Sequence, residues 1–64
     1  MSYEEFKSAV ETLDKRNVNT PLEQWILWWL YRMTDMIRID DECYDVSTLE
    51  KFYDMLVERG IVNE

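Results

Sequence analysis

Histidine is absent from this 64-residue chain, and cysteine, glycine and proline occur once each. With Cys43 as the only thiol, the chain cannot form an internal disulfide or the cysteine–histidine cluster of a structural zinc site. Basic residues are also few, seven against fourteen acidic ones, which gives a net charge of −7. We therefore expect no direct binding to nucleic acid or to an anionic membrane, and any electrostatic partner should be a basic protein.

Long apolar runs are missing as well. The longest extends from Trp25 to Tyr31 and ends at Arg32, whereas a membrane-spanning helix needs about 20 apolar residues. The first residues, MSYEEFK, are polar and acidic and lack the pattern of a secretory signal. Together with the single thiol, these features predict a cytoplasmic protein.

A helix-start pattern, Ser/Thr-x-x-Glu, begins at Ser2, at Thr20 and at Ser47. In this pattern the hydroxyl accepts a hydrogen bond from the third helical amide, and the glutamate binds the cap amide in return. Apolar residues with helical spacing follow each occurrence. The sequence therefore predicts an all-α fold, a compact single domain over residues 1–64 with helices at about 3–16, 21–38 and 48–59. Gly60 fits the left-handed position that ends the third helix.

The second predicted helix has the widest apolar face, an arc of about 140° that predicts a central helix packed by both others. This arc contains Leu22, Trp25, Ile26, Trp29, Leu30, Met33, Met36 and Ile37. We expect Trp29 in particular to fill the core. Residues 37–46 are interpreted as a loop, because a single short strand would have no partner in this chain.

Leu27, Trp28 and Tyr31 lie outside this arc, on the opposite side of the same predicted helix, where they are neighbours. One interpretation is that Ile39, Val46 and the loop fold back over them. Another is that Trp28 stacks with Arg32 as a surface cation–π pair. A third is that the three residues form a contact surface for another chain, because contiguous exposed aromatic groups are unusual.

Negative charge is concentrated in the second half of the chain. Glu50, Asp54 and Glu58 recur every four residues of the third predicted helix, which spaces them about 6 Å apart. This spacing is comparable with that of phosphates along a nucleic-acid strand. The row is either an ordinary solvated helix face or a surface that occupies a basic groove meant for DNA or RNA. The complete set of predicted partner-binding residues is Leu27, Trp28, Tyr31, Asp40, Asp41, Glu42, Asp45, Glu50, Asp54 and Glu58.

No catalytic residue, cofactor-binding residue or metal ligand is predicted. The chain has no histidine base and no glycine-rich phosphate loop. A calcium-binding loop counted from Asp40 would have Asp45 and Lys51 where a glycine and a glutamate are required. Cys43 lies among acidic residues, which should raise the pKa of its thiol and make it a poor nucleophile.

These observations predict a small acidic protein-binding module without catalysis, an inhibitor or regulator that occupies the basic, nucleic-acid-binding surface of a partner protein. In size and charge it resembles the inhibitors that phages encode against host defence, including anti-CRISPR and DNA-mimic proteins. One alternative is a homo-oligomeric subunit, such as a homodimer, whose Leu27–Trp28–Tyr31 face is a self-interface. The other is a small metal-binding or catalytic module built on the carboxylates.

Overall fold

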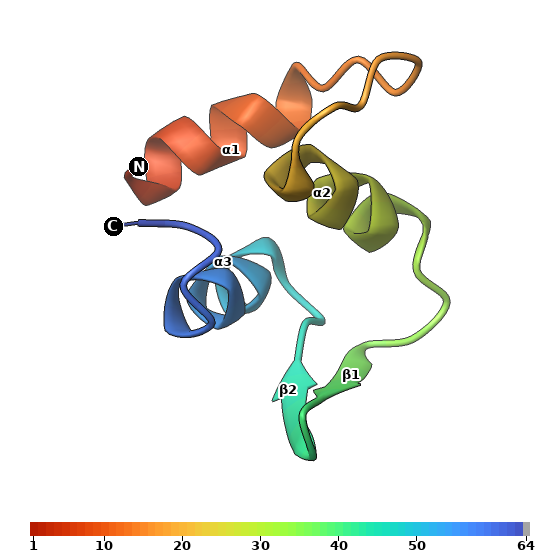
Figure 1. Cartoon of the computed structure of the whole chain (residues 1–64), viewed down its shortest axis with the longest axis vertical. Coiled ribbons are helices and arrows are strands. Elements are labelled where there is room, and N and C mark those ends of the chain that lie inside the picture. Colours follow the sequence, from red (N-terminus) through yellow and green to blue (C-terminus); the bar gives the residue numbers. More distant parts are fainter. Residues whose placement is uncertain (64) are drawn as a thin grey trace.

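The structure, a computed structural model, describes residues 1–63, which form three helices and one β-hairpin. In chain order the elements are α1 (Tyr3–Glu11), α2 (Pro21–Tyr31), β1 (Met36–Ile39), β2 (Glu42–Asp45) and α3 (Leu49–Glu58). Figure 1 shows the hairpin projecting at one end of the longest axis, with the helices grouped above it. The prediction of an all-α fold is therefore wrong, because residues interpreted as a loop form a two-stranded antiparallel sheet.

The hairpin forms because this segment supplies its own strand partner. Ile37, Ile39 and Tyr44 are half-buried and pack on the core, while the residues between them are exposed, the alternation expected of a strand with one covered face. Asp40 and Asp41 form the turn with φ angles of 49° and 67°. Positive φ at both positions fits a type I′ turn, and aspartate adopts this conformation more readily than most residues.

Helix starts are confirmed at two of the three predicted positions. Complete capping boxes begin at Ser2 and at Thr20. At α3 the predicted cap is wrong by one residue: Thr48, not Ser47, caps the helix and accepts a hydrogen bond from the Lys51 amide at 3.2 Å. Each cap satisfies an amide that has no partner within its helix.

The end of α3 is confirmed at Gly60, whose φ is +76°. The Gly60 amide donates to the carbonyl of Val57 at 3.0 Å, and the Ile61 amide donates to that of Leu56 at 2.9 Å. These two bonds define a Schellman motif, which satisfies the last helical carbonyls.

Helix α1 ends at Glu11 and does not reach residue 16. The Thr12 hydroxyl bonds the Ser8 carbonyl at 2.9 Å, and the Asp14 carboxylate accepts from the Arg16 amide at 3.0 Å. Short polar side chains that bind nearby backbone in this way compete with helix continuation.

Helix α2 ends at Tyr31, seven residues before the predicted end at Arg38. Arg32 adopts an extended conformation with ψ of 151°, and its Nη1 donates to the Trp29 carbonyl at 2.7 Å. In a continuing helix, the amide of residue 33 would occupy this carbonyl. Met33 and Met36, both predicted to be core residues, are consequently exposed.

The core is centred on α3 and not on α2, so the prediction of a central second helix is wrong. Among residues 1–63, eight side chains are buried, and α3 supplies half of them. Helices α1 and α2 contribute one each. The eight are Phe6, Ile26, Val46, Phe52, Tyr53, Met55, Leu56 and Val62.

Trp29 joins three parts of the fold although its side chain is half-buried. Its ring stacks on Phe52 of α3, with centroids 5.5 Å apart and an interplanar angle of 12°. Its indole N–H donates to the carbonyl of Val46, just after β2, at 2.9 Å. The Arg32 guanidinium lies over the same ring, 4.3 Å from its centroid. Trp29 therefore links α2 to α3 and to the hairpin exit.

Candidate functional site

The four predicted binding acids of the hairpin all have partners within the chain. Each carboxylate has its own contact: Arg59 for Asp40, Arg38 for Asp41 at 3.2 Å, Tyr44 for Glu42 at 2.6 Å, and Lys51 for Asp45 at 2.9 Å. Two of these contacts, Arg59–Asp40 and Lys51–Asp45, hold the hairpin to α3. Asp40 and Asp45 therefore have a structural role that the sequence pattern did not reveal.

Two ionisable groups of the hairpin have pKa values that these contacts change. The Ser47 hydroxyl and amide, together with the Lys51 ammonium, lower the pKa of the Asp45 carboxyl from its ordinary value of 3.8 to about 2. The hydrogen bond from the Tyr44 hydroxyl to Glu42 raises the pKa of Tyr44 above its usual value of 10.0. In both cases the shift favours the protonation state that keeps the contact.

We expect the Asp45 carboxyl to titrate in the folded protein with a midpoint near pH 2, as measured by its side-chain carbon resonance in NMR. Because the pKa is lower in the folded state, Asp45 stabilises the fold above about pH 4, and this contribution disappears as the pH falls from 3.8 to about 2. Ser47→Ala should raise the midpoint, and Lys51→Met should raise it less. Lys7→Met on α1 is the control and should leave it unchanged. A midpoint near 3.8 in the wild type would contradict the hydrogen bonds described for this carboxylate.

The remaining predicted acids form the α3 carboxylate row, defined as Glu50, Asp54 and Glu58. All three are exposed. Among residues 1–63, no lysine or arginine side chain lies within ion-pair distance of any of them. Their charge is therefore available to groups outside the chain, in contrast to that of the hairpin acids.

A shallow hollow of about 430 Å³ lies beside the first two members of this row. Glu50 and Asp54 line it together with Glu4 of α1, and Tyr3 and Tyr53 complete it. The two tyrosine rings meet edge to face, with centroids 5.5 Å apart. Sequence analysis missed Glu4 and Tyr3, because only the packing of α1 against α3 brings them to the row.

The three residues of the predicted aromatic surface, Leu27–Trp28–Tyr31, differ in how exposed they are and in what they contact. Trp28 is half-buried and packs against the core residue Phe52, with centroids 6.3 Å apart. Leu27 is also half-buried. Tyr31 is 64% exposed and has the Lys15 ammonium 5.2 Å from its ring centroid. Arg32 stacks on Trp29 and not on Trp28, so the predicted Trp28–Arg32 pair is wrong.

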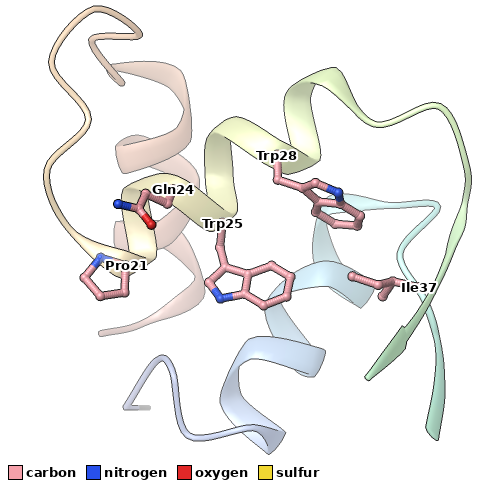
Figure 2. A pocket seen from close by; sticks show the side chains of 5 residues that line it. All are labelled: Pro21, Gln24, Trp25, Trp28 and Ile37. Atoms are coloured by element: carbon pink, nitrogen blue, oxygen red, sulfur yellow. The ribbon is translucent and has the colours of Figure 1, made fainter. Parts of the chain in front are cut away.

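Trp28 instead lines an apolar groove of about 310 Å³ between α2 and β1. Figure 2 shows its ring and that of Trp25 beside one another, with Ile37 of β1 pointing toward them. The two rings are nearly perpendicular, at 81°, and their centroids are 5.7 Å apart. Pro21 and Gln24 complete the lining. Sequence analysis placed Trp25 and Ile37 in the core and so did not predict this groove.

Three further properties of the described chain bear on function. Within residues 1–63, no three cysteine, aspartate or glutamate side chains are arranged to hold a metal ion. In the same part of the chain, no helix has the length and apolar character that crossing a membrane requires. Cys43 is exposed and is not part of a disulfide.

No protein-family model, no curated protein and no solved structure matches this chain. The resemblance to phage inhibitors, anti-CRISPR proteins and DNA mimics therefore gains no support from the comparisons. The structural features that bear on function are therefore the hollow beside the α3 carboxylate row, the groove between α2 and β1, and the charges around them.

Proposed function

We propose that this protein binds, without catalysis, to a partner protein with a basic, nucleic-acid-binding surface, through the α3 carboxylate row. One observation carries the proposal: Glu50, Asp54 and Glu58 are exposed and have no ion pair among residues 1–63, whereas every predicted binding acid of the hairpin is engaged within the chain. Unpaired carboxylates in a row on a rigid helix present the charge pattern that a basic groove binds.

The surroundings of the row support this proposal. Glu4 adds a fourth carboxylate beside Glu50 and Asp54, and Tyr3 and Tyr53 give the hollow an aromatic lining. A lysine or arginine side chain that enters this hollow would meet carboxylates and tyrosine rings, whose faces attract cations. The net charge of −7 would speed the approach of a basic partner from a distance.

The proposal includes the absence of catalysis and a cytoplasmic location. The row consists of exposed carboxylates, and general acid–base catalysis by a carboxylate usually needs burial or a close like charge that brings its pKa toward neutrality. The exposed thiol of Cys43 is the kind of group that a reducing compartment keeps free.

The test begins with capture of the partner from a lysate of the producing cells on the immobilised wild-type protein, followed by its identification. We expect a DNA- or RNA-binding protein whose nucleic acid competes with this chain for the same surface. Asp54→Lys combined with Glu58→Lys should then lower the association rate constant at least tenfold in surface plasmon resonance. The wild-type rate constant should fall as salt rises, because exposed charges are screened beyond about 8–10 Å at physiological ionic strength.

A matched control separates the effect of the α3 carboxylate row on association from the effect of net charge. Asp54→Lys and Glu11→Lys change the charge equally at exposed helical positions, and no ion pair is lost at either site. Only Asp54→Lys should slow association strongly. Equal slowing by both variants, or association that is insensitive to salt and to the double reversal, would exclude the α3 carboxylate row as the binding surface.

A further inference from the structure

The outer edge of β1 has main-chain groups without partners. The β1–β2 register pairs Ile37 with Tyr44 and Ile39 with Glu42. The Val46 amide donates to the Asp35 carbonyl, just before β1, at 2.7 Å. In the same register the odd-numbered residues of β1, Ile37 and Ile39, direct their main-chain groups toward β2. In an antiparallel pair the alternate residues point theirs the other way. The main-chain groups of Met36 and Arg38 therefore face away from the hairpin.

Three of these four outward groups have no hydrogen-bond partner among residues 1–63: the Met36 carbonyl and both groups of Arg38. The Met36 amide has only a long contact to the Thr34 hydroxyl, at 3.3 Å. No proline or bulge protects the strand, and its exposed side chains are one methionine and one arginine. Unpaired main-chain groups along a strand edge are a template for pairing with another strand.

This edge adjoins the apolar groove between α2 and β1. Figure 2 shows β1 on the groove side of β2, with Ile37 directed toward Trp25 and Trp28. A strand added to β1 would lie about 4.8 Å away, and its alternate side chains would project next to Ile37. The edge and the groove could therefore be covered together by one extended segment.

The charge of this face indicates which occupant it accepts. The five groove residues are uncharged, and the one charged side chain of β1, that of Arg38, is paired with Asp41 at 3.2 Å. This face therefore lacks the free negative charge that would attract the basic partner proposed for the α3 row. In a chain of net charge −7, a face lined without carboxylates is the place where two copies can approach with least repulsion. The uncharged lining of this face favours a second copy of the chain.

We propose that two copies of this protein pair their β1 strands antiparallel, across a twofold axis at Ile37, to form a four-stranded sheet. Met36 of each copy then lies opposite Arg38 of the second copy, and both residues direct their main-chain groups across the new boundary. Ile37 meets Ile37 of the second copy beside the two grooves. This register keeps the two Arg38 side chains from facing each other directly, which like charges on adjacent strands disfavour. A four-stranded sheet is also more stable than an isolated hairpin.

The test is the oligomeric state from about 1 µM to about 1 mM by sedimentation velocity. We expect the wild type to form a dimer as its concentration rises. Met36→Arg places like charges opposite each other at both ends of the paired strands, and the dimer dissociation constant should rise at least tenfold. Adding Arg38→Glu to this variant creates two opposite-charge pairs in the same positions and should restore the dimer.

The variants are chosen so that folding does not confuse the result. Met36 and Arg38 are both exposed, so the far-ultraviolet circular dichroism of each variant should match that of the wild type. Ser8→Arg on α1 makes the same charge change at an exposed site away from the hairpin, and should leave the dimer intact. The proposal is overturned if the wild type stays monomeric at every concentration, if Ser8→Arg weakens the dimer as much as Met36→Arg does, or if Arg38→Glu fails to restore it.

Discussion

Replacing Trp29 with alanine is expected to unfold most of the protein at 25 °C. Removing a large aromatic side chain from a packed interior costs about 3–5 kcal/mol, and a domain of this size has a total stability near 5 kcal/mol. The loss is large although the side chain is only half-buried, because three contacts disappear together. These are the stack on Phe52, the hydrogen bond to the Val46 carbonyl and the Arg32 contact. Circular dichroism and urea unfolding would measure the effect.

Trp29→Phe separates the ring from its N–H group. Phenylalanine keeps a ring that can stack on Phe52 and leaves the Val46 carbonyl without its donor, so we expect a loss of about 1–2 kcal/mol. The alanine variant should lose at least twice as much free energy of unfolding. A Trp29→Ala protein that remained well folded would show that the contacts linking α2 to α3 are not those described.

The parts of the fold that depend on neighbouring residues could be predicted from the sequence. The capping boxes at Ser2 and Thr20 and the turn at Gly60 each need only a few residues in the right order. The hairpin was missed because its turn is Asp-Asp and lacks the glycine that usually marks a type I′ turn.

The end of α2 could not be predicted because it depends on contacts distant in sequence. Periodicity alone favoured a longer helix, with Met33 and Met36 on the apolar face. The chain leaves the helix at Arg32, and Trp29 then reaches Val46, 17 residues further along the chain. Tertiary contacts of this kind override local preference.

The α3 carboxylate row could be recognised from the spacing of its three residues on one helix. The sequence could not show which acids have partners within the chain, because the arginine that pairs with Asp40 lies 19 residues away at the end of α3. The groove at Trp25 and Trp28 was missed for a similar reason, since Ile37 reaches it only because the chain turns between the end of α2 and the start of β1.

Arg32 is expected to be the most important charged residue for stability. Its side chain is 15% exposed. Its Nη1 donates to the Trp29 carbonyl at 2.7 Å, its Nη2 lies 3.5 Å from the Ser47 carbonyl, and its planar group covers the Trp29 ring. Hydrogen bonds from a charged donor contribute about 1.5–3 kcal/mol each, so Arg32→Met should lower the free energy of unfolding by about 2–3 kcal/mol.

Arg32→Lys tests whether the shape of the guanidinium matters in addition to its charge. A lysine ammonium cannot lie flat on Trp29 and also donate to two carbonyls in different directions, so this variant should lose nearly as much free energy of unfolding as Arg32→Met.

Arg38→Met is the matched control. Arg38 is 70% exposed and its ion pair with Asp41 is a surface contact, so we expect this variant to change the free energy of unfolding by no more than about 0.5 kcal/mol. Urea unfolding of the three variants gives the comparison. If Arg32→Lys were as stable as the wild type, charge alone would account for Arg32, and the helix would have to end at Tyr31 for another reason. If Arg38→Met lowered the free energy of unfolding as much as Arg32→Met does, the contacts of Arg32 between α2 and the hairpin exit would not explain its effect on stability.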